Sequence, residues 1–138
     1  MKKYFIVLSL SVFCFACGNQ SNSSSDATKD AAEPAAAATS VMDSPDWVKG
    51  EKLVAKSDCF TCHKLSDAST GPSYLSVSEK YENTDANQAL LAKKVISGGT
   101  GVWGQIPMAP HPQLSTEDAT AMVKYVLLQK EAKKELKK

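Results

Sequence analysis

Arginine is absent from this chain of 138 residues, and its 16 lysines are nearly balanced by 15 acidic residues, for a net charge of +1. Such a balance leaves no basic footprint for a nucleic acid, so no nucleic-acid partner is expected. Aromatic residues make up only 7% of the sequence, which limits the core that the chain can build from its own side chains. Two of the four cysteines fall within the first 17 residues, so no disulfide framework can be read.

Long hydrophobic runs are also missing. The longest one, from Tyr4 to Ala16, follows Lys2 and Lys3 and is too short to span a bilayer. A basic start followed by a short apolar run is the layout of a secretory signal, with a membrane anchor as the alternative. The sequence therefore places the protein outside the cytoplasm, in the periplasm.

The end of this signal has two interpretations. Cys17 stands between Ala16 and "GNQSNSSSD", an arrangement that resembles a bacterial lipoprotein signal and implies lipid attachment at Cys17. The alternative is ordinary cleavage after Ala16. Residues 18–44 are rich in Ser, Asn and Ala, and we predict a disordered tether there, because little apolar surface is available to offset the cost of ordering. The domains expected are thus a signal at 1–17, a tether at 18–44 and one folded domain at 45–138.

Helix signals dominate the folded part, and no run alternates convincingly like a strand. We expect helices from Pro45 to about Ser57, around 73–81, from a Thr84 cap to about Ile96, and from Ser115 onward. Gly50, inside the first helix, suggests a close contact with another helix. A long Gly- and Pro-rich stretch between Gly98 and Leu114 shows no regular pattern, and irregular stretches of that length are usually functional.

The motif "CFTCH", from Cys59 to His63, carries the most specific chemistry in the sequence. Two thiols separated by two residues can form thioethers with the two vinyl groups of a haem, and the next imidazole can then bind its iron. Cys-x-x-Cys-His is accordingly read as a c-type haem attachment site. It predicts one covalent haem c, anchored by Cys59 and Cys62, with His63 as the proximal ligand.

Two other uses of this motif fit the sequence less well, a zinc site and a redox pair. A structural zinc ion needs four N or S ligands, and the folded part offers only the three residues of the motif and His111. Adjacent residues such as Cys62 and His63 chelate one tetrahedral ion poorly. A thioredoxin-like redox pair requires a βαβ context, which the sequence does not show.

Three methionines are available as a second axial ligand. Met42 precedes the predicted domain, and Met122 lies on the apolar face of the last helix, where a core role is expected. Met108 is placed between Pro107 and Pro110, in a segment with few backbone degrees of freedom. Its thioether can be held in one place without regular structure, so Met108 is the candidate.

The chain at this point resembles the small bacterial class I cytochromes c, which donate electrons to nitrite reductases and oxidases. The resemblance covers about residues 46–130 and rests on "CFTCHK", on "GP" nine residues past the histidine, on "GVWGQIPM" and on a closing helix. It implies an all-α cytochrome c fold of about four short helices around one haem. It also implies that the Pro72 carbonyl accepts a hydrogen bond from His63, and that Trp103 donates to a haem propionate. Lys94 stands where the family often has an arginine.

Some of these implied roles have alternatives. Trp103 can instead be a core residue, and Lys94 a solvated lysine. The family often has an asparagine three residues after the ligand methionine, where this chain has His111. We expect an exposed loop histidine there, or a competing iron ligand if the loop opens.

These features together predict a monomeric one-electron carrier that is not an enzyme. Its partners would be redox proteins, either an oxidase, a reductase or a quinol-oxidising complex, and it would be held at a membrane by a lipid on Cys17. One alternative is a haem enzyme or a sensor of peroxide or gas with a labile Met108. Another is a fixed subunit of a respiratory complex.

Overall fold

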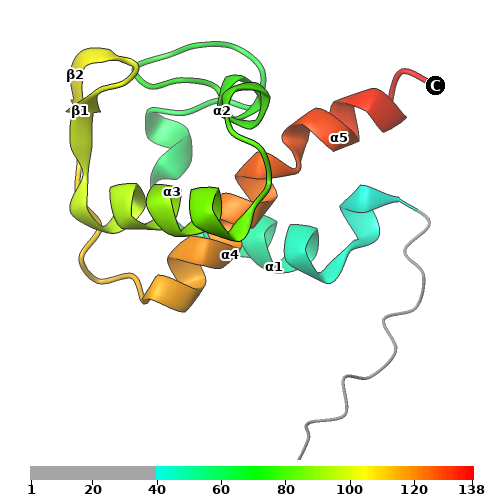
Figure 1. The fold of residues 1–138 in the computed structure, drawn as a ribbon, viewed down its shortest axis with the longest axis horizontal. Helices are drawn as coiled ribbons and strands as arrows, with labels where there is room; N and C mark the ends of the chain where they lie inside the picture. The colour runs from blue at the N-terminus through cyan, green and yellow to red at the C-terminus, as the bar shows by residue number, and fades with distance from the viewer. Residues whose placement is uncertain (1–39) are drawn as a thin grey trace, which may run out of the picture. The chain divides into compact units, whose positions relative to one another are not determined.

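Helices account for most of residues 40–138, the part of the chain that the computed structural model describes (Figure 1). The predicted signal and residues 18–39 of the predicted tether lie outside the described residues. No helix within residues 40–138 combines the length and the apolar character needed to cross a membrane. The elements are the α-helices α1 (Pro45–Ala55), α2 (Tyr74–Lys80), α3 (Asp85–Ser97), α4 (Thr116–Leu127) and α5 (Gln129–Glu135), the 3-10 helices η1 (Val41–Asp43) and η2 (Cys59–Thr61), and the strands β1 (Gly99–Gly101) and β2 (Gly104–Met108).

Hydroxyl side chains cap the N-termini of α1, α2, α3 and α4. In each case a Ser or Thr oxygen accepts a hydrogen bond from a backbone N–H three residues on, and so satisfies one of the donors that the first turn leaves unpaired. The capping residues are Ser44 for α1, Ser73 for α2, Thr84 for α3 and Ser115 for α4. The predicted helix starts are therefore confirmed.

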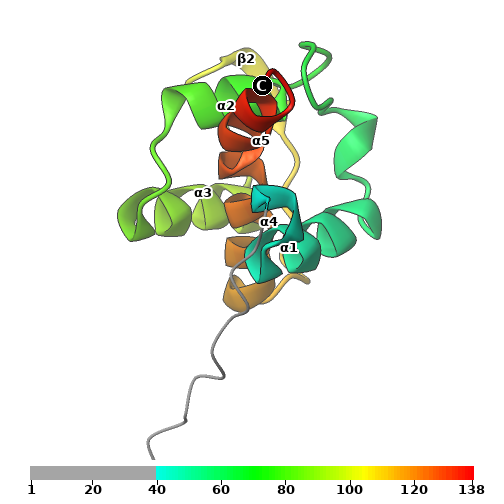
Figure 2. The same cartoon turned by 90° about the vertical axis from the view of Figure 1, so that its right-hand side faces the viewer.

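Helix α4 is the centre of the packing. It contacts α1, α3 and α2. Figure 2 shows α1 and α3 on opposite sides of it. One buried cluster, around Trp47, Tyr125 and Met122, joins α1 to α4, and a second one, around Ala92, Val123 and Leu127, joins α3 to α4. These contacts fix α1, α3 and α4 relative to one another.

The closing helix differs from the prediction, because the structure has two helices where the sequence suggests one. Helix α4 ends at Leu127, and α5 begins at Gln129 and continues in nearly the same direction in Figure 2. The Gln129 side-chain amide donates to the Tyr125 carbonyl over 3.1 Å. An uninterrupted helix would use that carbonyl for the Gln129 backbone N–H, so the side chain competes with the helical hydrogen bond at the break.

The stretch from Gly98 to Leu114 is more regular than expected. Strands β1 and β2 pair as an antiparallel hairpin, with Gly99 opposite Met108 and Gly101 opposite Gly104. A pattern of alternating apolar and polar residues cannot reveal strands this short, since β1 contains only Gly, Thr and Gly. Gly101 and Gly104 have positive φ angles, which the tight reversal between the two strands requires.

Residues 40–44 contact the folded domain that the sequence predicts at 45–138. The hydroxyl of Ser40 and the backbone N–H of Val41 both donate to the Glu135 carboxylate, at 2.6 and 3.1 Å. Val41 and Met42 also pack against the Trp47 cluster. Contacts with residues far along the chain thus order positions 40–44, which local composition assigned to the tether.

Candidate functional site

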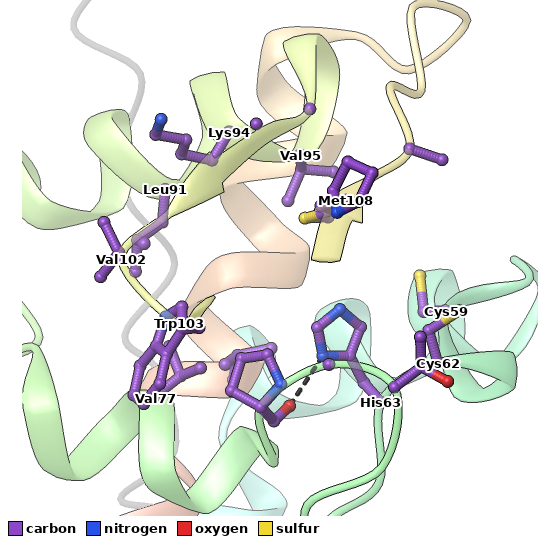
Figure 3. A pocket seen from close by; sticks show the side chains of 18 of the residues that line it. Cys59, Cys62, His63, Val77, Leu91, Lys94, Val95, Val102, Trp103 and Met108 are labelled. Carbon is purple, nitrogen blue, oxygen red and sulfur yellow. Dashed lines mark hydrogen bonds between the residues drawn. The ribbon is translucent and has the colours of Figure 1, made fainter. Parts of the chain in front are cut away.

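A pocket of about 420 Å³ lies between α3, the β1–β2 hairpin and the segment that follows α1. Figure 3 shows Met108 on one side of this pocket and His63 on the other, with Cys59 and Cys62 beside His63. Most of the other lining is apolar, including Val77, Leu91, Val95, Val102, Met122, Val123 and Val126. The cysteine motif and the methionine, 45 positions apart between His63 and Met108, therefore face one cavity.

A 3-10 turn shapes the cysteine motif. Helix η2 covers Cys59–Thr61, and the backbone N–H groups of Cys62 and His63 both donate to the Cys59 carbonyl, at 3.3 and 3.0 Å. This turn brings both sulfurs and the His63 ring to the same cavity. Cys59 is half-buried and Cys62 is exposed, and neither forms a disulfide.

The His63 ring is held from behind by the segment that contains Gly71 and Pro72. Its Nδ1 lies 2.7 Å from the Pro72 carbonyl oxygen, so Nδ1–H donates there and Nε2 is left as the nitrogen with a free lone pair (Figure 3). The Gly71 N–H in turn donates to the Cys62 carbonyl over 2.8 Å, which fixes that segment against the motif. A carbonyl behind the ring is the usual way to orient a metal-binding histidine.

Gly71 is required by the closeness of the imidazole. A β-carbon at this position would lie 2.6 Å from His63 Cε1 and 2.9 Å from Nδ1, closer than real contacts allow. Its φ angle is not positive, so the requirement is one of space rather than of backbone conformation. The "TGP" sequence therefore contributes both the clearance at Gly71 and the acceptor at Pro72.

Burial changes the acidity of two groups beside the motif. It raises the pKa of the free Cys59 thiol, and the nearby Asp58 carboxylate adds to the effect. Burial also raises the pKa of Tyr74, whose ring stacks on His63 with the centroids 5.6 Å apart. One face of the His63 ring is thus covered by the uncharged aromatic side chain of Tyr74.

Met108 ends strand β2 and is partly buried, unlike most of the hairpin. Gly98, which follows α3, lies directly against it: a β-carbon on Gly98 would come within 2.5 Å of the Met108 carbonyl oxygen. Gly98 also has φ +69° and ψ −166°, a conformation that is essentially restricted to glycine. This glycine lets the end of α3 lie against the methionine.

Trp103 and Lys94 also line the pocket. Trp103 is in the turn of the hairpin and is 46% exposed, so it is not a core residue in this structure. The ammonium group of Lys80 lies 5.4 Å from the centre of its ring. Lys94, in the last turn of α3, extends its Nζ over Gly99.

The other candidates are placed as follows. Met122 is 3% exposed and belongs to the core, as expected, although it also reaches the floor of the pocket. Met42 packs against the Trp47 cluster. His111 is not the exposed loop histidine that the sequence suggests, because its side chain is only 14% exposed and both ring nitrogens face oxygen atoms of other residues.

The residues of this pocket fit a c-type haem. Nitrogen and sulfur donors stand on opposite sides, which suits a metal with two axial ligands, and the two thiols lie at one edge beside the histidine. Leu90, Val102 and Ile106 line the pocket and are 48%, 52% and 65% exposed. Large apolar side chains in this arrangement need an apolar group to cover them, and a porphyrin ring provides it.

Comparison with known proteins gives a consistent result. Residues 47–130 match the model of the family described as Cytochrome c. Cytochrome c-551 of Allochromatium vinosum is 37% identical over 89 residues, which are 64% of this chain and 95% of that protein. Cytochrome c-552 of Nitrosomonas europaea is 37% identical over 75 residues, 54% of this chain and 73% of that protein.

Solved structures that resemble this chain are also cytochromes c. The crystal structure of wild-type Nitrosomonas europaea cytochrome c552 superimposes with a TM-score of 0.54 at 35% identity, covering 57% of this chain and 98% of that one. The class 1 cytochrome MtoD of Sideroxydans lithotrophicus gives 0.51 at 26% identity, with 60% and 95% covered. The mostly helical fold expected from the sequence is therefore the cytochrome c fold, with a small hairpin added. The chain belongs to the cytochrome c family, whose members carry a covalently bound c-type haem and transfer electrons rather than catalyse a reaction.

Proposed function

We propose that this protein is a one-electron carrier with a single haem c, bound covalently by Cys59 and Cys62 and ligated by His63 and Met108. The arrangement of His63 and Met108 on opposite sides of one apolar pocket is the observation that carries the proposal. When bound, the haem supplies an iron that alternates between the ferrous and ferric states. With both axial positions taken by side chains, none is left for a substrate.

The surrounding residues set the properties of that iron. Pro72 accepts from Nδ1–H of His63 and so keeps Nε2 directed at the metal with increased basicity. A thioether ligand favours the ferrous state, and His/Met ligation therefore raises the reduction potential. Trp103 and Lys94, at the pocket edge, would hold the propionates. A carrier of this kind suits an oxidase or reductase as acceptor.

The proposed setting is extracytoplasmic, where homologous small cytochromes c typically work. A lipid on Cys17 would anchor the protein to a membrane, and the polar segment after it would let a monomeric domain reach a redox partner such as an oxidase, a reductase or a quinol-oxidising complex. Partners would meet the exposed edge of the pocket, where Trp103 and Ile106 are accessible. Electron-transfer contacts of this type are small and short-lived.

Covalent attachment is tested on the denatured protein. Haem stain should remain with the polypeptide after acid–acetone extraction and denaturing electrophoresis, and it should be lost when Cys59→Ala and Cys62→Ala are combined. Haem that is extracted from the wild-type protein would disprove attachment through these two sulfurs.

Axial ligation is tested by Met108→Ala. The oxidised wild-type protein should show the weak far-red absorption of a sulfur–iron bond, and the variant should lose it, have a lower potential and bind added cyanide quickly. Met122→Leu is the matched control, because it removes a thioether from the core while conserving volume. Rapid cyanide or peroxide binding by the wild-type ferric protein at neutral pH would instead support the enzyme or sensor alternative.

A further inference from the structure

His111 connects two segments on different sides of the pocket. Its Nε2 lies 3.1 Å from the Asp58 carboxylate, and Asp58 immediately precedes the anchor Cys59. Its Nδ1 lies 3.3 Å from the Val95 carbonyl, in the last turns of α3. The side chain is 14% exposed, so these contacts are made by a largely enclosed ring.

The backbone of His111 reinforces the connection to α3. Its N–H donates to the carbonyls of Val95 and Ile96, at 3.2 and 3.0 Å. Carbonyls at the end of a helix lack partners within the helix, so an N–H from another segment satisfies them. His111 is three residues after Met108, and Pro110 between them limits the freedom of the intervening chain. A constraint on His111 is therefore passed to Met108.

The hairpin itself offers little else to hold Met108. Residues 99–107 are all exposed, and neither strand contributes to the two buried clusters of the fold. By contrast, α1 and α4 are joined by the buried cluster around Trp47 and Tyr125, in addition to the surface ion pair between Lys49 and Glu117. Segments with few buried contacts open most easily. The position of Met108 therefore depends strongly on the contacts of His111, whereas the packing of α1 on α4 depends little on the Lys49–Glu117 pair.

We propose that His111 is a positioning residue, which holds the Met108 loop against the pocket by joining it to Asp58 and to the end of α3. We call these contacts the His111 latch. The latch rests on the proposed ligation of iron by Met108, and its role is to keep the loop closed. Ligand exchange at the iron then requires the latch to open.

The test measures cyanide binding to the full-length ferric holoprotein at neutral pH and at cyanide concentrations where loop opening limits the rate. Asp58→Asn conserves the size of an exposed side chain and removes its charge. We expect cyanide to bind about two- to fivefold faster, which corresponds to the free energy of an ion pair with one exposed partner. His111→Gln loses both ring contacts, and we expect about a tenfold acceleration. The matched control Glu117→Gln removes one partner of the remote Lys49 pair and should leave the rate unchanged.

The double variant Asp58→Asn with His111→Gln tests whether the two side chains act through each other or independently. If the two side chains act together, Asp58→Asn should add little to the rate of His111→Gln. Amide hydrogen exchange gives a second readout: exchange at Met108 and His111 should quicken in Asp58→Asn, while exchange in α5 should not. If His111→Gln does not accumulate, Asp58→Asn and its exchange pattern decide the question.

The outcomes distinguish the latch from the function on which it rests. A wild-type protein without the far-red band would overturn Met108 ligation itself. A wild-type protein with the band, but with unchanged cyanide rates and exchange in Asp58→Asn, would overturn the latch alone. Equal acceleration by Asp58→Asn with and without His111 would also overturn it, since the carboxylate would then act through another group.

Discussion

At the scale of single residues, the site depends on small clearances around His63. The Pro72 carbonyl accepts a hydrogen bond from the ring, and the Tyr74 ring stacks on one of its faces. Gly71 lies so close to the ring that there is no room for a β-carbon at this position. Hydrogen bonding and sterics thus agree on one orientation of the imidazole. A side chain held in this way needs no rearrangement to bind a metal.

Gly71→Ala should disturb this orientation. The added methyl group would force the ring away from Gly71 and lengthen its hydrogen bond to Pro72, at a cost of about 1–3 kcal/mol in the free energy of unfolding. We expect a smaller yield of haem-loaded protein and a changed potential, measured by absorbance and by redox titration. Ser69→Ala, an exposed change two residues earlier, should leave both unaffected. A Gly71→Ala protein with wild-type stability and potential would contradict the close fit.

At the scale of secondary structure, the crossing of α1 and α4 fixes the frame on which the pocket is built. Gly50 is buried in α1 and faces the Ala121 carbonyl and the β-carbon of Tyr125 in α4. The close helix contact expected from a glycine inside a helix is therefore confirmed. Trp47 packs edge-on against Tyr125, with ring centroids 4.8 Å apart, one turn away from this contact.

Gly50→Ala should destabilise the protein although alanine is the better helix former. Intrinsic propensity gains about 1 kcal/mol, but the new methyl group meets backbone atoms of α4 that cannot move alone, so we expect a net loss of about 1–2 kcal/mol. Chemical denaturation of the holoprotein would measure it. Lys52→Ala, exposed on the same helix, should change stability by no more than about 0.5 kcal/mol. Equal stability of Gly50→Ala and wild type would mean that the two helices can separate freely.

At the scale of the whole domain, its first and last segments are joined. Glu135 in α5 accepts hydrogen bonds from the Ser40 hydroxyl and the Val41 N–H, and these lower the pKa of its carboxyl below the ordinary 4.5. A carboxyl whose pKa is lowered by folding stabilises the protein above its ordinary pKa. That stabilisation is lost as the pH falls through the folded-state value.

Glu135→Gln should therefore lower the melting temperature at neutral pH. The difference from wild type should shrink below pH 4.5 and vanish once the folded-state carboxyl is also protonated, because the wild type then carries a neutral group as well. Thermal unfolding followed by circular dichroism across this range would show it. Glu51→Gln, at an exposed position of α1, is the control and should leave the melting temperature at neutral pH unchanged. A difference that stays constant with pH would rule out a contribution from the charge.

The proposed membrane attachment depends on Cys17, which lies outside the described residues. Metabolic labelling with an acyl-chain analogue should mark the wild type and not Cys17→Ser, and the variant should move from the membrane fraction to the soluble fraction. The reason is that a lipid chain is the only strongly apolar group expected near the mature N-terminus. An unlabelled, soluble wild-type protein would favour cleavage after Ala16.

Local sequence predicted most of the helices and singled out the candidate haem-binding motif. Capping residues such as Ser44 and Thr84 act through neighbours three positions away, so local sequence was enough to place the starts of the helices. Covalent haem attachment likewise depends on spacing within five consecutive residues. For this reason Cys59, Cys62 and His63 could be singled out without any knowledge of the fold.

Contacts between distant segments could not be predicted from local sequence. The burial of His111, the covering of the His63 ring and the placement of Ser40 depend on residues elsewhere in the chain: Asp58, Tyr74 and Glu135. The break after α4 and the short hairpin were also missed. A side-chain amide competing for one carbonyl, and strands built largely of glycine, leave no periodic pattern to read. Local rules fix helix ends and covalent motifs, but long-range packing decides which groups share a pocket, because that depends on the folded path of the whole chain.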